Sequence, residues 1–376
     1  MRTDEKDSFL LDRGFQVYFT SYPVSRRHLD YAQLDFRDFD PGAIVCRDGD
    51  KSVLSDPLRD PKALVPALIS DAATLPDKLR TAKLVAKVLP RGATTASEDD
   101  SDPDSSTLEY LRASGLSEQY INSFYRPFYG GVFLSRTLYT SARIFRFTLR
   151  MLATGRTAVP ARGMGEIPRQ LASHLPEGAM HLGSPVDSLL REGNRVVGVR
   201  AAGVEHEADA VVVATEAPVV GKLTGEKVPE ESVGEVCLYY ETDGLGSGKK
   251  IMLNAEDGAF VNNAVEISNV SERYAPPGRH LLCAVTLDGL DLPEAELYRR
   301  VIEDVSRWYP EASFEPLTLY RIPYGQVAQP PDVHRKLPKN RTDTPGLVLA
   351  GEYTEDSSIN GSMLSGEKSA EEVMRA

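Results

Sequence analysis

The chain has 376 residues, of which 41% are hydrophobic and 26% are charged, and its formal net charge is −12 at pH 7. These values predict a soluble globular protein with a sizeable core and two domains. The acidic balance argues against nucleic acid as the main partner, because binding to phosphates needs a basic surface. No apolar stretch reaches the length of a transmembrane segment, and the charged start is unlike a signal peptide.

The first 150 residues are predicted to hold two short strands followed by helices. Residues 9–20 alternate in polarity around Gly14, which indicates a strand on each side of it. Residues 57–150 are predicted to be mostly helical, with an amphipathic segment at 79–89. The acidic tract 97–106 is expected to be a solvated loop, since it lacks the glycine and closing glutamate of a calcium loop. Ser106 and Glu109 predict a capping box for the next helix.

Cysteine and histidine usage predicts neither a metal site nor a disulfide framework. Cys46, Cys237 and Cys283 have no metal-binding spacing and are odd in number, so a reducing, cytoplasmic compartment is expected. The six histidines form no His-x-x-x-His pair.

From residue 184 onward the pattern changes to strands. Residues 186–191 and 195–200 flank a glycine turn and predict a hairpin. The run 209–215 predicts a fully buried strand. More strands are expected over 235–290, then a helix at 292–308 and a strand at 317–323.

The C-terminal segment predicts a ligand site. Residues 347–350 form an apolar run short enough for a buried strand, and Gly351 and Glu352 follow it directly. A polar loop then leads to Gly361 and to a helix rich in small residues. The start of a helix offers free N–H groups and partial positive charge, and a carboxylate can accept hydrogen bonds from a ribityl or ribose hydroxyl.

This segment resembles the C-terminal flavin-binding motif of the flavoprotein amine oxidases and their phytoene-desaturase-like relatives. The matching residues are Ala350-Gly351-Glu352 and Asn360-Gly361-Ser362, with Ser362 in place of the usual alanine. The resemblance implies that Gly351 and Glu352 contact FAD, with Glu352 on the ribityl chain. It also implies that the backbone of Ile359, Asn360 and Gly361 faces the isoalloxazine ring.

Three internal segments resemble the same family. The segment 159–172 is similar to its Pro-x-Gly-Gly-Met-Gly-x-Leu motif, so Gly163 and Gly165 are candidates for close approach to a ligand, although a glycine-rich helix start without a ligand fits equally well. Thr215 ends a strand that matches the family and could contact the cofactor. Val186 lies where the family contacts the adenine of FAD.

Residues 126–133, 139–143, 261–263 and 321–330 resemble a narrower group of uncharacterised FAD/NAD(P)-dependent oxidoreductases in this superfamily. The resemblance implies an α/β fold with two domains. A Rossmann-like FAD-binding domain, N-terminally incomplete, would comprise residues 1–25, 155–235 and 336–376. A mixed α+β substrate domain would comprise residues 26–154 and 236–335.

The family's first βαβ unit, with its Gly-x-Gly-x-x-Gly loop, is expected to be missing. The sequence starts at Met1-Arg2-Thr3, where the family continues from a Gly-Gly-Arg motif. Loss of this unit would remove the main anchor of the pyrophosphate and leave strand edges unpaired.

The function implied by the resemblance is FAD-dependent oxidation, with hydride transfer from a C–N or C–C bond to flavin N5. The expected partner is a small amine or apolar substrate. Alternatives are a phytoene desaturase-like or isomerase-like polyene enzyme, a non-catalytic remnant that needs a separate βαβ chain, and a nucleotide-binding regulatory module. No catalytic residue is assigned. Residues that could contact the substrate, although core packing explains each equally well, are Tyr324, Phe15, Arg13 and Tyr353.

Overall fold

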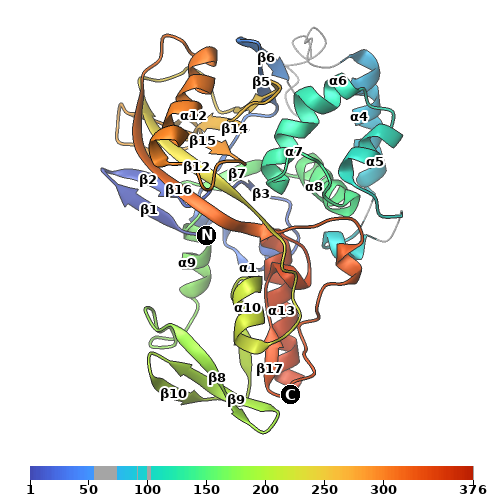
Figure 1. Ribbon diagram of the computed structural model, residues 1–376, viewed down its shortest axis with the longest axis vertical. Helices are drawn as coiled ribbons and strands as arrows, with labels where there is room; N and C mark the ends of the chain where they lie inside the picture. The colour runs from blue at the N-terminus through green and yellow to red at the C-terminus, as the bar shows by residue number, and fades with distance from the viewer. Residues whose placement is uncertain (55–73, 91, 100–102, 376) are drawn as a thin grey trace.

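The computed structural model describes residues 1–54, 74–90, 92–99 and 103–375 (Figure 1). Within these residues the largest sheet is mixed and seven-stranded, in the order β16-β12-β15-β14-β13-β5-β6. Neighbouring strands of this sheet are antiparallel, except for β13 and β5, which are parallel. Its strands are β5 (Ala43–Arg47), β6 (Asp50–Leu54), β12 (Ser232–Thr242), β13 (Ile251–Asn254), β14 (Asn263–Glu266), β15 (His280–Thr286) and β16 (Phe314–Val327).

Alternation of side chains along the strands gives this sheet two buried faces. On one face Val236 and Leu238 of β12 belong to an apolar cluster with Trp308 of α12 (Glu294–Trp308). On the other face Cys237 and Tyr239 belong to the main apolar cluster of the molecule. The sheet therefore separates a helix-covered core from a second core that surrounds the cavity described below.

A group of helices covers the second face (Figure 1). They are α4 (Leu75–Val88), α5 (Thr107–Ala113), α6 (Glu118–Tyr120), a π-helical turn η3 (Ile121–Tyr125), α7 (Arg126–Phe133) and α8 (Ala142–Thr154). The predicted helical region is confirmed where it is described; its part at 57–73 lies outside the described residues. The capping box of Ser106 and Glu109 is confirmed.

The prediction that the acidic tract is a solvated loop is wrong at both described ends. Asp99 forms an ion pair of 2.6 Å with Arg146, and the buried carboxylate of Asp104 lies 3.8 Å from Arg143. Both arginines lie on the buried side of α8, and a buried guanidinium needs a carboxylate partner. The acidic residues therefore neutralise interior cations.

The remaining elements form a second region around a parallel pair of strands. In the described residues, β11 (Val211–Val213) pairs in parallel with β17 (Leu347–Leu349), and the C-terminal helix α13 (Ile359–Arg375) and α10 (Ala217–Thr224) accompany them (Figure 1). A three-stranded sheet projects beside this pair: β8 (Val186–Glu192), β9 (Arg195–Ala201) and β10 (Val204–Glu207). The predicted hairpin at 186–200 is confirmed.

The prediction of a fully buried strand at 209–215 is wrong in extent and burial. Only residues 211–213 form the strand, and Val212 is 41% exposed. Among the described residues, the strand has a hydrogen-bonded strand neighbour on one side only, so its other edge has no strand beside it.

Further short elements complete the described fold. They are β1 (Thr3–Lys6), β2 (Phe9–Asp12), β3 (Tyr18–Phe19), α1 (Ser25–His28), α2 (Tyr31–Leu34), β4 (Phe36–Asp38), η2 (Ala96–Glu98), β7 (Thr157–Pro160), α9 (Glu166–Ala172), α11 (Ile267–Val270), η4 (Glu272–Tyr274), η5 (Val333–Arg335) and η6 (Glu352–Thr354). The two strands predicted around Gly14 correspond to β2 and β3. The fold is thus mixed α/β, as predicted, and the domain boundaries stay a prediction. Among the described helices, none has the length and apolar character needed to span a membrane.

Candidate functional site

A cavity of about 2960 Å³ extends from the start of α13 to the face of the seven-stranded sheet. At the α13 end its wall includes Gly351, Glu352 and Ile359, and at the sheet end it includes Glu235 and Asn263. Aromatic residues from the helices close one side: Tyr120, Phe124, Phe128 and Phe147. The cavity therefore joins the predicted ligand site to an apolar chamber over the sheet.

The first turn of α13 is fixed by its own side chains. Ser358 Oγ accepts a hydrogen bond of 2.9 Å from the backbone N–H of Gly361 and so caps the helix. Asn360 is fully buried; its Oδ1 accepts from Val24 N, and its Nδ2 donates to Thr94 O, both at 2.9 Å. The side chain of Asn360 thus ties two distant loops to the helix start. Asn360 is not part of the cavity wall, and its predicted backbone contact with the flavin stays a prediction.

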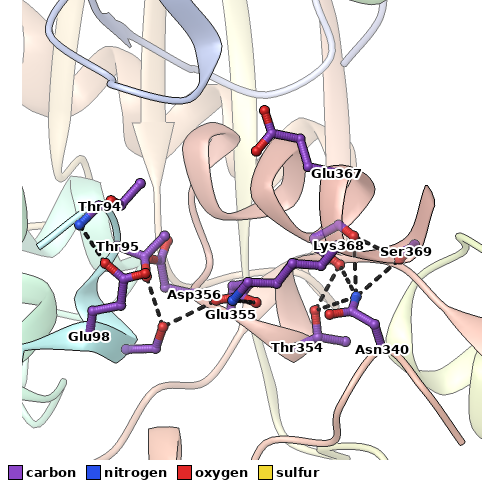
Figure 2. Close-up of polar contacts among 12 residues, drawn as sticks. Thr94, Thr95, Glu98, Asn340, Thr354, Glu355, Asp356, Glu367, Lys368 and Ser369 are labelled. Carbon is purple, nitrogen blue, oxygen red and sulfur yellow. Dashed lines mark hydrogen bonds and ion pairs between the residues drawn. The ribbon is translucent and has the colours of Figure 1, made fainter. Parts of the chain in front are cut away.

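A second set of contacts holds the loop before α13. Asp356 Oδ2 accepts from Ala96 N at 2.9 Å, and Lys368 of α13 forms an ion pair of 2.5 Å with Glu355. Figure 2 shows Glu355 between Lys368 and the loop that carries Thr95. Burial raises the pKa of Asp356 to about 6. The first turn of α13 is therefore held from both sides.

The side chain of Asn340 connects the strand β17 to the helix α13. Its Nδ2 lies 2.9 Å from Leu349 O, 2.9 Å from Ser365 Oγ and 3.0 Å from Ser369 Oγ (Figure 2 shows Asn340 beside Ser369). Ser365 Oγ also accepts from the backbone N–H of Gly351 at 2.8 Å. These contacts fix the distance between the strand end and the helix, and so the position of Glu352.

Glu352 is a predicted ligand residue that lies on the cavity wall. Its Oε1 accepts from Tyr324 Oη at 2.8 Å and from Val327 N at 3.2 Å, and the residue lines the cavity. Burial raises the pKa of its carboxyl group, and the two hydrogen bonds oppose that shift. Tyr324 also lines the cavity, so these two predicted residues meet in one place.

Three other predicted residues also line the cavity but are engaged by protein groups. Tyr353 Oη donates to Ala350 O at 2.8 Å, which fixes the end of β17. Arg13 forms an ion pair of 2.7 Å with Asp4. Phe15 donates its backbone N–H to Glu235 Oε1 at 2.8 Å.

The remaining predicted residues divide between the cavity and the packing around it. Thr215 lines the cavity, whereas Val186 lies on β8, is 44% exposed and is not part of the cavity wall. Gly163 has φ +94°, and a Cβ there or at Gly165 would meet Thr3. These two glycines therefore allow the backbone at 163 and 165 to pack closely against β1, the first strand of the chain. Their predicted ligand contact stays a prediction.

Gly361 is also placed by packing. It is buried and outside the cavity wall, and a Cβ on it would collide with the backbone oxygen of Asp356. Glycine is therefore required here to bring the loop against the helix.

Glu235 is a site residue that the sequence reasoning missed. It lies on β12, is 4% exposed and lines the cavity, and burial raises the pKa of its carboxyl group to about 7. The available signal was a single acidic residue inside the apolar strand at 233–240. A buried carboxyl group that titrates near neutrality can bind or exchange a proton in the working pH range.

Replacing Glu235 by glutamine should change how stability depends on pH. The pKa of this carboxyl group is about 4.5 in the unfolded chain and about 7 in the folded protein. Its contribution to the free energy of unfolding is therefore fully present below pH 4.5 and is lost as the pH rises through about 7. We expect the Glu235→Gln variant to gain on the order of 3 kcal/mol relative to the wild type between pH 5 and pH 8. Urea unfolding at both pH values measures this gain. Parallel pH curves for the two proteins would contradict it.

Comparisons with known proteins cover almost the whole chain. Residues 1–374 match the sequence model of the family described as flavin containing amine oxidoreductase. No curated protein matches significantly.

Solved structures share the fold at low identity. An oxidoreductase from Methanosarcina mazei is 16% identical, with a TM-score of 0.71 over 100% of this chain and 90% of that chain. Wild-type putrescine oxidase bound to putrescine is 15% identical, with a TM-score of 0.69 over 100% and 90% of the two chains. Reduced UDP-galactopyranose mutase is 13% identical, with a TM-score of 0.67 over 100% of this chain and 87% of that chain.

Proposed function

Because the chain belongs to the family of flavin-containing amine oxidoreductases, we propose that it binds FAD beside α13 and oxidises a C–N or C–C bond of a small organic substrate. Family membership makes the protein a flavin-dependent oxidoreductase. The observation that supports FAD and this location is Glu352, a mostly buried carboxylate on the cavity wall, next to the start of a 17-residue helix.

The residues around Glu352 fit the flavin end of the cofactor. Glu352 can accept from a ribityl hydroxyl, and Ile359 and Met363 give the cavity an apolar wall suited to a flat ring. The helix dipole favours negative charge near the start of α13. The volume of about 2960 Å³ exceeds that of a usual small-molecule pocket, which leaves room for a substrate beside the cofactor.

The proposal concerns the flavin and ribityl groups rather than the pyrophosphate. Residues 1–376 contain no Gly-x-Gly-x-x-Gly sequence, the loop that binds pyrophosphate in dinucleotide-binding folds. The predicted cofactor residues that lie on the cavity wall are Thr215, Gly351, Glu352 and Ile359.

In this proposal the protein contributes orientation, electrostatics and exclusion of water. When bound, the flavin would accept the hydride, which carries the two electrons removed from the substrate. The aromatic wall keeps water away from the reacting bond, since Phe124, Phe128 and Phe147 line the chamber. Asn340 and Lys368 hold α13 and its preceding loop in position, so that the Glu352 carboxylate is fixed before a ligand arrives.

A second candidate is desaturation or isomerisation of a polyene. The apolar, aromatic character of the chamber supports it, because a polyene needs no polar anchor. Anaerobic mixing with a primary amine and with a polyene separates the two candidates. Bleaching of the flavin absorbance by the amine identifies an amine oxidase, and bleaching by the polyene identifies a desaturase. An isomerase leaves the absorbance unchanged and converts the polyene to an isomer, which chromatography detects.

The Glu352→Gln variant tests the proposed cofactor contact. Glutamine keeps an oxygen for Tyr324 and Val327 but removes the charge, and a hydrogen bond to a charged group contributes about 1.5–3 kcal/mol. We expect the FAD dissociation constant, measured by quenching of flavin fluorescence, to rise by about 10- to 100-fold. Glu372→Gln on the same helix, outside the cavity wall, is the control and should leave it unchanged. Equal affinity for all three proteins would refute the contact.

A further inference from the structure

Two buried polar side chains share the cavity face of the seven-stranded sheet. Cys237 of β12 and Asn263 of β14 are both paired with Val285, so these three residues form one row across the sheet. Glu235 lies two residues from Cys237 and therefore points to the same face. Glu235 is 4% exposed and Asn263 is 1% exposed, and both line the cavity.

The amide of Asn263 offers a donor that the described protein groups do not use. Asn262 Nδ2 donates to Pro127 O at 3.0 Å and to Asn263 Oδ1 at 2.8 Å, which sets the orientation of the Asn263 amide. Within the described part of the chain, Asn263 Nδ2 has no hydrogen-bond partner. A Cβ on Gly131 would lie 2.8 Å from Asn263 Oδ1, so glycine makes room for this amide. A buried donor without a partner is costly, and a ligand acceptor would remove that cost.

Glu235 offers the complementary chemistry. Its Oε1 accepts from Phe15 N at 2.8 Å, and across the described residues no basic side chain forms an ion pair with it. A Cβ on Gly14 would lie 2.9 Å from the same oxygen, so the glycine backbone shields one side of the carboxyl group. A buried carboxyl group without a cation favours a ligand that brings a proton donor.

The spacing of the two groups sets the shape of the ligand. Two strand spacings separate Glu235 and Asn263 across the sheet, and two residues separate them along it, which places their Cα atoms roughly 12 Å apart. Apolar residues of α7, including Phe128 and Val132, line the same cavity. A ligand that reaches both groups therefore needs an apolar body about ten bonds long.

We propose that Glu235 and Asn263 are the specificity-determining pair of this enzyme's substrate chamber. The ligand is an elongated apolar molecule with an amine or hydroxyl donor at Glu235 and a carbonyl oxygen at Asn263. This inference rests on the proposed function, which assigns the chamber to the substrate.

Calorimetric binding of three probes at pH 8 tests the pair independently of flavin chemistry. The probes are 8-aminooctanamide, which carries both groups, and octylamine and octanamide, which carry one each. We expect 8-aminooctanamide to bind the purified wild-type protein at least tenfold more tightly than either single-group probe. Glu235→Gln should weaken binding of the two amine probes at least tenfold and spare octanamide. Asn263→Ala should weaken binding of the two amide probes and spare octylamine.

Glu266→Gln is the matched control, because Glu266 is a buried glutamate of the same sheet whose carboxylate accepts from Leu245 N and which lies outside the cavity wall. It should change no probe affinity. If Glu235→Gln does not fold, Glu235→Asp, which keeps the charge but shortens its reach, should still weaken binding of the same two probes and spare octanamide. Equal binding of the three probes, no binding, or equal losses in all variants would overturn the pair. A protein that binds the probes as predicted but takes up no flavin would refute the proposed cofactor and leave the pair standing.

Discussion

Replacing Asn340 by leucine is expected to lower the free energy of unfolding by about 3–5 kcal/mol. The buried amide joins Leu349 O to Ser365 Oγ and Ser369 Oγ, and leucine has a similar size but no donor. Several buried oxygens would lose a partner at once, each at a cost of about 1–3 kcal/mol, with partial compensation among the serines. Urea unfolding followed by circular dichroism measures the loss.

The control for this variant is Asn122→Leu, at an exposed position of η3 where the side-chain oxygen accepts a hydrogen bond of 3.0 Å from Arg126 Nε. Its free energy of unfolding should change by less than about 0.5 kcal/mol. Similar losses in the two variants would show that Asn340 has no special role in holding β17 to α13.

Gly361→Ala is expected to destabilise the protein by about 2–4 kcal/mol, whereas Gly366→Ala on the same helix should stabilise it by about 0.5–1 kcal/mol. The Cβ at position 361 would collide with the backbone oxygen of Asp356, so the loop before α13 would have to move. The Cβ at position 366 would meet no atom within 4 Å, and alanine favours a helix over glycine. Thermal unfolding of both variants measures the difference.

The same displacement should reach the ligand site, because Asp356 and Glu352 lie on one short loop whose position the first turn of α13 fixes. Gly361→Ala is therefore expected to weaken FAD binding as well as stability. If both variants changed stability in the same direction, the packing account of this glycine would be wrong.

The strand, loop and helix of the C-terminal segment could be predicted from the sequence because their signals are local. The buried run at 347–349, the glycine and carboxylate behind it, and the helix from Ile359 are all set by short-range pattern and capping chemistry. Glu352 and Tyr324 were both predicted and lie 2.8 Å apart. Their contact could not be predicted, because it depends on how β16 passes the end of β17.

The residues that reasoning from sequence missed or misplaced depend on long-range packing. Asp99 and Asp104 look like solvated loop residues until α8 brings Arg146 and Arg143 beside them. Val212 looks like a core residue in the sequence, but its side chain is 41% exposed, and no described strand pairs with the second edge of its strand. Glu235 looks like one charge in a strand until the cavity appears in front of it. In each case the environment of the residue is set either by a residue more than 30 positions away in the sequence or by a space that no side chain fills.

The most direct test of the central claim is a spectrum of the purified chain after mixing with FAD and removal of the excess by gel filtration. We predict retained absorbance bands of oxidised flavin at a stoichiometry near one per chain, lost in Glu352→Gln at concentrations where the wild type stays loaded. A folded chain that emerges colourless would contradict the placement of FAD beside α13.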